Sequence, residues 1–429
     1  MRSSSTMGRD WRLLWSASAV STVGDGAFLA VLPLLAATIT TDPRLIAGVT
    51  AWGTLPWLLA ALPAGALADR LDPRRTMAGA QLVQAALVAG LATATLAGAG
   101  RIAVVYAIAF ALGLAETLVK VSAQKLLTAA VPADRLEQAN GRQNGTFFAN
   151  KQFLGPPLGA LLFAYAASLP LWLCVLTFTG SALLIWRIRV RPDAPAARTT
   201  TLRADIGEGV RWVARHRLIR TVALLAGVAN LANFLAMATF VLFARERLGA
   251  TDAQYGVVVA LTGVGGILGS VLSSRIVTVL GGRRTATITL FTTPLAMIAL
   301  GLLARDIVTL AVLASVTSFG AALWNVASAS MRQRSVPAPL MGRVSSVGLL
   351  LSWGTQPIGA VLGGLIATWW GLAAPWLAGG GLRLAAALLA LPVLAAWPTD
   401  SASDRASDHR ASHAVNSAKS PAPTARPAQ

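Results

Sequence analysis

Residues 65–75 read GALADRLDPRR, and this short charged stretch separates two long apolar segments. Its eleven residues hold two aspartates and three arginines. Apolar segments of about 20 residues, the length that a helix needs to cross the hydrocarbon core of a bilayer, recur along the rest of the chain. The stretch is therefore expected to be a polar link between two membrane-spanning helices.

The composition of the whole chain indicates lipid as its solvent. Of the 429 residues, 55% are hydrophobic and only 12% are charged, whereas a soluble domain holds roughly 25% charged residues. The net charge of +19 is also typical of nucleic-acid-binding proteins. The basic residues lie in short links between apolar segments, which argues against that class. We expect a protein that lies in a lipid bilayer and binds no nucleic acid.

The apolar segments predict twelve transmembrane spans. The first follows a basic N-terminus and could pass for a secretory signal. Asp25 interrupts its apolar run and eleven spans follow, so we interpret it as a retained helix. The expected spans are 12–38, 44–68, 75–98, 102–126, 143–166, 169–188, 219–244, 253–279, 284–304, 307–330, 343–368 and 372–397.

Lysine and arginine residues concentrate in alternate links, as the positive-inside rule describes. With both termini inside, the outer links hold only Arg44, Arg101, Arg245, Arg247 and Arg305. The distribution predicts a multi-pass protein of the plasma membrane with both termini on the cytoplasmic side. The sequence DIGEGVRWVARHRLIR, which begins at Asp205, predicts an amphipathic helix on the inner membrane surface.

Three landmarks recur in the same order at offsets of 200–209 residues. They are the arginine pairs 74–75 and 283–284, the segments VPADRLEQANG and VPAPLMGRVSS, and the segments GPPLGALL and TQPIGAVLGGLI. We therefore predict an all-α membrane protein of two pseudo-symmetric six-helix bundles, an arrangement built for alternating access. The expected parts are bundles over 1–190 and 219–397, a cytoplasmic linker over 191–218 and a disordered tail over 398–429.

The sequence resembles the major facilitator superfamily over residues 10–397. The superfamily signature G-x-L-A-D-R-x-D-x-R-R is matched at Gly65, Leu67, Ala68, Asp69, Arg70, Asp72, Arg74 and Arg75. The fifth span holds a motif similar to that of drug–proton antiporters, at Gly155, Pro156, Pro157 and Gly159. The two VP segments look like those of the branch that contains macrolide and siderophore exporters.

This resemblance implies proton-driven export of a hydrophobic or amphiphilic small molecule by the rocking of two bundles. It implies that Gly65, Asp69, Arg70, Arg74 and Arg75 form a latch between the halves at the cytoplasmic side. The antiporter-type motif would form a pliable interface between the halves, or would be ordinary tight packing. We interpret Ser273 and Ser274 as standing where the acids of the first copy lie, which predicts an asymmetric latch.

Two acidic residues, Asp25 and Glu116, lie well inside predicted spans, where a charge is costly and marks a functional site. Burial favours the neutral form of a carboxyl group, so each is a candidate proton carrier. Lys151 is the expected basic partner. The alternative is a permanent ion pair that fixes helix packing. Lys120 is expected to extend toward the cytoplasm.

A substrate pocket is expected between the first, fourth, seventh and tenth spans. Its candidate residues suit an amphiphilic solute, or are packing residues instead: Phe28, Asn230, Asn233, Phe234, Trp324 and Asn325. No phosphate-binding loop is present, so we do not expect ATP to drive transport directly. The polar groups at membrane depth are too scattered for catalysis, so we expect no enzyme. We also expect no metal and no cofactor, a proton gradient as driving force, and a monomer. Import of a polar metabolite, or a receptor or scaffold role, stays open as an alternative.

Overall fold

The computed structural model describes residues 8–132, 135–190, 202–337 and 340–394, without the side chains of 60–70 and a few other helical residues. Every regular element in these ranges is a helix, and the η elements are π-helical. The elements are α1 (Arg9–Ile39), α2 (Pro43–Arg70), α3 (Pro73–Leu96), α4 (Ile102–Ala130), α5 (Leu136–Phe148), η2 (Ala149–Leu154), α6 (Gly155–Tyr165), α7 (Leu169–Trp186), α8 (Leu202–Arg215), α9 (Arg217–Met237), α10 (Phe240–Leu242), η3 (Phe243–Arg247), α11 (Asp252–Leu280), α12 (Gly282–Leu303), α13 (Ile307–Ser335), α14 (Met341–Trp370) and α15 (Ala374–Leu394).

Within the described residues, ten helices are long and apolar enough to cross a membrane. The second predicted span is occupied by α2, and the fifth by the continuous rod α5–η2–α6. The all-α membrane architecture is confirmed, while the count of twelve spans stays a prediction. The predicted tail 398–429 and residues 191–201 of the predicted linker lie outside the described residues.

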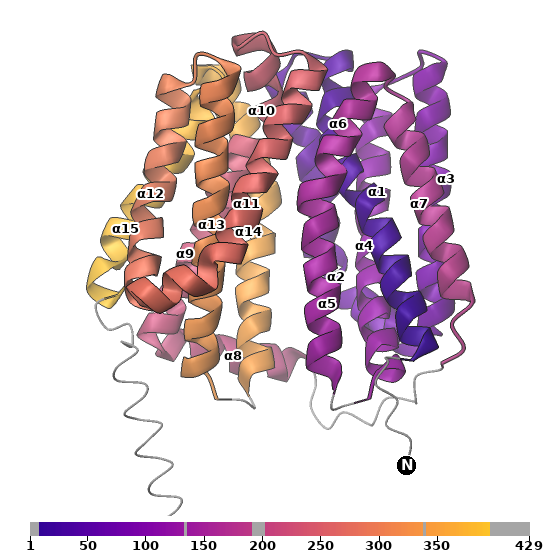
Figure 1. The fold of residues 1–429 in the computed structure, drawn as a ribbon, viewed down its shortest axis with the longest axis horizontal. Helices are drawn as coiled ribbons and strands as arrows, with labels where there is room; N and C mark the ends of the chain where they lie inside the picture. The colour runs from indigo at the N-terminus through magenta and orange to yellow at the C-terminus, as the bar shows by residue number, and fades with distance from the viewer. Residues whose placement is uncertain (1–7, 133–134, 191–201, 338–339, 395–429) are drawn as a thin grey trace, which may run out of the picture.

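The helices form two bundles that lie side by side (Figure 1). Helices α1–α7 make the first half and α9–α15 the second. The short helix α8 lies at the end of the molecule where the chain begins, and it packs against α14. We call this end the linker end and the opposite one the distal end.

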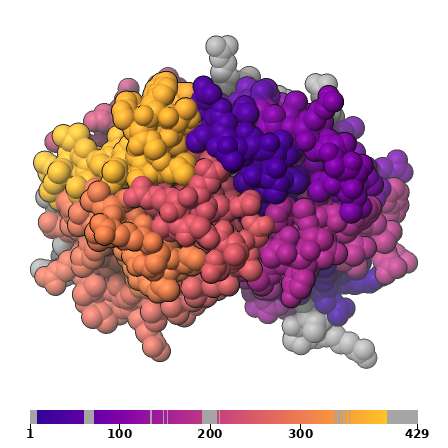
Figure 2. Space-filling model, turned by 90° about the horizontal axis from the view of Figure 1, so that it is seen from above, coloured from indigo at the N-terminus to yellow at the C-terminus, as the bar shows by residue number. Residues whose placement is uncertain are grey.

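The two halves share one hydrophobic core at the distal end. Its buried side chains come from both halves, for example Leu34 and Phe163 with Phe240 and Trp376. A small alanine cluster also joins α2 to the second half there. Figure 2 looks onto this end and shows the halves meeting along a continuous seam.

At the linker end each half has a core of its own. One cluster lies entirely in the first half, around Trp11 and Leu126. Another joins the second half to α8, around Val213 and Trp324. Among the described side chains, the shared core therefore lies at the distal end, and the cores toward the linker end are separate.

Short polar links at the distal end begin helices by side-chain capping. Asp306 accepts hydrogen bonds from the Thr309 N–H (2.8 Å) and hydroxyl (2.7 Å) before α13, and these bonds lower the pKa of its carboxyl group. Asp42 precedes α2, and hydrogen bonds from the Arg44 side chain lower its pKa in the same way.

Candidate functional site

Asp25, Glu116 and Lys151 lie near the midpoints of α1, α4 and the α5–η2–α6 rod, and so at one depth. The Lys151 ammonium donates a hydrogen bond to Glu116 Oε1 and forms an ion pair with it. The Glu116 side chain is 25% exposed and that of Lys151 14%. Asp25 interacts electrostatically with both partners. The structure thus brings together the three residues that the sequence singled out.

Lys151 lies in the π-helical stretch η2, a feature that sequence reasoning missed. Pro156 and Pro157 follow it at the start of α6, where an absent N–H is tolerated. Because prolines cannot donate to the carbonyl groups of the preceding turn, this point of the rod favours a wider turn. Wide π turns inside helices occur frequently at functional sites. In the sequence, the available signal for this π-helical stretch was the pair of prolines that follows a polar segment.

A row of polar side chains fastens this rod to α1. Gln143 Nε2 donates to Ser18 Oγ (3.0 Å), and Trp15 Nε1 donates to Thr146 Oγ1 (3.0 Å). Asn150 Nδ2 donates to the Ala19 carbonyl at 2.8 Å, one residue before Lys151. These bonds fix the backbone of η2 against α1 and so set the position of the Lys151 ammonium.

The glycines of the antiporter-type motif also face α1, in their own half. A Cβ atom on Gly155 would lie 2.6 Å from the Cα atom of Gly26, and one on Gly159 would lie 2.8 Å from Ala27 Cα. The expected interface between halves is made instead by the next residue, Ala160. A Cβ atom on Gly256 of α11 would lie 2.9 Å from Ala160 Cβ. The motif glycines therefore serve tight packing within the first half.

The second half repeats this packing. Gly359 and Gly363 of α14 lie so close to the carbonyl oxygens of Leu231 and Leu235 in α9 that a Cβ atom fits at neither. Helix α14 thus stands to α9 as α6 stands to α1. The internal repeat found in the sequence corresponds to an equivalent glycine-mediated contact in each half.

Lys120 does not extend toward the linker end. Its ammonium lies 4.7 Å from the ring centroid of Trp57, at the midpoint of α2, and 5.6 Å from that of Phe147. The Lys151 ammonium lies 5.5 Å from the ring centroid of the same Phe147. The cluster thus holds two ammonium groups, two carboxyl groups and two aromatic rings, and sequence reasoning had not assigned the rings.

The predicted pocket residues are divided by their burial. Phe28 is buried in the shared distal core and Trp324 in the linker-end core of the second half, so both serve packing. Asn233 and Asn325 are exposed, and Phe234 is partly buried. A pocket role for these three stays a prediction.

Asn230 and Asn325 take different positions in the second half. The Asn230 side chain is partly buried and donates to the Ala226 carbonyl of its own helix at 3.0 Å. Asn325 is seven residues from Ser318 and so on the same face of α13. A Cβ atom on Gly266 would lie 2.9 Å from Ser318 Oγ and 3.0 Å from Phe153 of η2. Asn325 therefore lies on the face of α13 that carries Ser318.

The sequence matches the family described as transmembrane secretion effector over residues 7–421. The chain belongs to this family. The match confirms the resemblance to the major facilitator superfamily, and it identifies the chain as a transporter rather than an enzyme. Such a transporter crosses the bilayer several times and takes a small molecule as its substrate.

The relatives of this chain in sequence include other transporters. It is 29% identical over 340 residues to the multidrug efflux pump Tap of Mycolicibacterium fortuitum, covering 76% of this chain and 81% of that protein. It is 24% identical over 358 residues to the MFS-type transporter y4rN of Sinorhizobium fredii, covering 82% and 87%. Its fold is similar to a bacterial homologue of the iron transporter ferroportin in the inward-facing state, with a TM-score of 0.66, 17% identity and coverage of 91% and 98%.

The charged stretch of the transporter, residues 65–75, covers the end of α2, the two residues that link it to α3, and the start of α3. Asp72 begins α3 by accepting a hydrogen bond from the Arg74 N–H at 2.9 Å, and the Arg74 guanidinium donates to the Ile188 carbonyl at 2.9 Å. Arg75 is exposed. These bonds stay within the first half. Gly65, Asp69 and Arg70 lie near or at the end of α2, and their side chains are outside the described part, so the latch stays a prediction.

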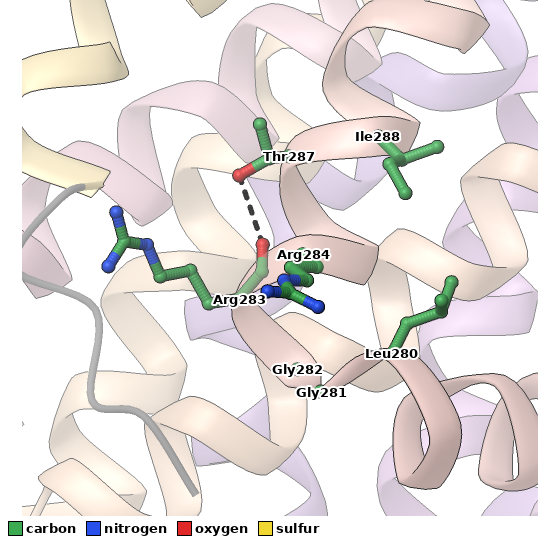
Figure 3. A pocket seen from close by; sticks show the side chains of 7 residues that line it. All are labelled: Leu280, Gly281, Gly282, Arg283, Arg284, Thr287 and Ile288. Atoms are coloured by element: carbon green, nitrogen blue, oxygen red, sulfur yellow. Dashed lines mark hydrogen bonds between the residues drawn. The ribbon is translucent and has the colours of Figure 1, made fainter.

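The corresponding link of the second half lacks the acidic cap. Gly281, with φ +81°, precedes α12 where Asp72 precedes α3. The helix starts place Gly281, and neither Ser273 nor Ser274, opposite Asp72. The expected equivalence of these serines with Asp69 stays a prediction. Figure 3 shows the exposed pocket here, of about 620 Å³, with the side chains of Arg283 and Arg284 at its edge.

Arg383 is a further charge at mid-depth, near the midpoint of α15. Its guanidinium Nη1 lies 3.6 Å from Met297 Sδ in α12. The sequence showed the charge but no role for it, and the contact with a thioether adds none.

Proposed function

We propose that the transporter is a secondary active exporter that exchanges protons for a hydrophobic or amphiphilic small molecule. The observation that supports this proposal best is the cluster of Asp25, Glu116 and Lys151 at mid-depth. Ionisable groups at this depth are costly and are typical of proton pathways. The similarity to a multidrug efflux pump supports export as the direction.

In the proposed mechanism, a proton on Glu116 removes the charge that holds Lys151. The ion pair joins α4 to η2, so its loss frees η2 from α4. Helix η2 contacts the other half through Phe153, which lies beside Gly266 of α11. A shift of η2 is thereby transmitted to the second half. The exchange of protons between the carboxyl groups and the two sides of the membrane then biases which end is closed.

The topology proposed with this function places the linker end at the cytoplasm. Both termini and the arginine-rich links then lie on the inner side of the plasma membrane. The separate cores at that end correspond to a conformation that receives substrate from the cytoplasm. The transporter would act as a monomer, with no cofactor, on the energy of the proton gradient.

Reconstituted vesicles with an internal pH-sensitive dye test the proposal. When the outer pH is lowered, protons should enter the vesicles while a substrate such as ethidium leaves them. The double substitution Asp25→Asn with Glu116→Gln should lower this coupled flux at least about tenfold. Asp42→Asn, in the distal link outside the cluster, is the matched control. An undiminished flux in the double variant would refute the proton role, and flux of substrate with the protons would refute export.

A further inference from the structure

The ammonium of Lys120 occupies a site made of aromatic rings. Trp57 of α2 and Phe147 of α5 lie 4.7 Å and 5.6 Å from it, both within the range of cation–π attraction. Both rings are partly buried, while Lys120 itself is exposed. Three different helices thus bring two rings to one cation at mid-depth.

An acidic group lies directly beside these rings. Glu116 precedes Lys120 by one helical turn, so their side chains share a face of α4. The carboxylate is held by Lys151, whose ammonium is 5.5 Å from the same Phe147 ring. Aromatic faces together with a carboxylate are the groups that bind organic cations, including quaternary ones.

We propose that Trp57, Phe147 and Glu116 form a binding site for a lipophilic organic cation, which Lys120 occupies while the transporter is empty. A lysine ammonium is compact and strongly hydrated, and its flexible stem can carry it to water. A bulky cation with apolar groups loses less hydration on entering and contacts more ring surface. It would displace the ammonium of Lys120 and take its place over the rings.

This inference deepens the proposed function, and rests on it for the direction of transport. A cationic substrate and a proton would both act on Glu116, and the carboxylate cannot hold both at full strength. Because of this competition, binding of the proton favours release of the cation, and binding of the cation favours release of the proton. An exchange of the two across the membrane requires such a coupling. An anionic substrate would instead be attracted by Lys120 and Lys151, and would bind best with the carboxyl groups protonated.

Titration calorimetry with tetraphenylphosphonium on the purified full-length transporter tests the inference. Removing the competing ammonium by Lys120→Gln should lower the Kd about threefold to tenfold, equal to about 0.7–1.4 kcal/mol, because the ammonium no longer competes for the faces of the two rings. Trp57→Leu should raise the Kd by a similar factor. Lys120→Arg keeps the charge over the rings and should not tighten binding. Lys125→Gln, on the same helix, controls for the loss of one positive charge.

A Kd that rises or stays unchanged in Lys120→Gln, in protein that elutes as a single folded species, overturns the inference, as does the absence of any binding to the wild type. If Lys120→Gln does not fold, tighter binding in Lys120→Arg than in the wild type overturns it equally. Vesicle flux separates this result from the proposed function. Tighter binding in Lys120→Gln without proton-coupled flux in the wild type supports the site and refutes the exporter, whereas coupled flux with unchanged binding does the reverse.

Discussion

Replacing Lys151 with methionine should destabilise the fold more than replacing Glu116 with glutamine. The glutamine keeps an oxygen that can accept from Lys151, and Asp25 remains as a second acid near the ammonium. The methionine removes the one cation with which both Asp25 and Glu116 interact, and leaves the repulsion between the two acids. Breaking a buried ion pair by removing one partner costs about 3–5 kcal/mol. Partial exposure and the second acid should reduce this to about 1–2 kcal/mol for Glu116→Gln, against about 3 kcal/mol for Lys151→Met.

A double-mutant cycle in mixed detergent, followed by tryptophan fluorescence at pH 8, measures these costs. The double variant should be less destabilised than the sum of the single variants by about 1–2 kcal/mol, since its partners are in contact. Lys125→Met is the control for removal of a lysine. Additive costs would show that the ion pair contributes nothing to stability. A larger cost for Glu116→Gln than for Lys151→Met would show that Asp25 does not interact with Lys151 as proposed.

Three further predictions use the same unfolding measurement. Gly159→Ala should destabilise the fold by about 1–3 kcal/mol because its Cβ atom meets Ala27. Gly145→Ala, where the space is open, should stabilise the fold by about 0.5–1 kcal/mol. Equal effects of the two substitutions would contradict the packing described for Gly159. Asp72→Ala should cost about 1 kcal/mol through the lost cap of α3, and no loss would show that the cap is idle. Asp306→Ala should have a lower free energy of unfolding than the wild type above pH 3.8, the usual carboxyl pKa. This difference should vanish as the pH falls through the lower pKa of Asp306 in the folded protein, because the capping charge is then lost. A difference that does not depend on pH would refute this prediction.

Much of the fold could be predicted from sequence because the membrane imposes a length on each span. The link 65–75 was placed between two helices by its charges alone, and α2 ends at Arg70 within it. The arginine pairs and glycine segments located the repeat, and the equivalent contacts of Gly159 and Gly359 agree with it. Which helix each glycine faces was not predictable, since spacing along one helix says nothing of the neighbour. The motif was therefore expected between the halves and lies within one.

The candidate site was predicted in its charges and missed in its rings. Asp25, Glu116 and Lys151 stand out because a charge at membrane depth is rare, whatever the fold. Trp57 and Phe147 are two among many aromatic residues, and only the packing of α2 and α5 brings them to Lys120. Burial separated Trp324 from a pocket role for a similar reason, since an apolar ring in a span fits a core as readily as a cavity.

The π-helical stretch makes the number of residues between two contacts matter as much as their identity. In a regular α-helix, Gly155 would lie about 140° around the axis from Asn150, five residues earlier. A turn that holds one more residue takes back about 100°, which lets both residues face α1. Deleting one residue from this stretch would therefore rotate the helix that follows it about its axis. It would turn the whole of α6 away from α1, and it would move Ala160 off α11 without changing a single side chain in either contact.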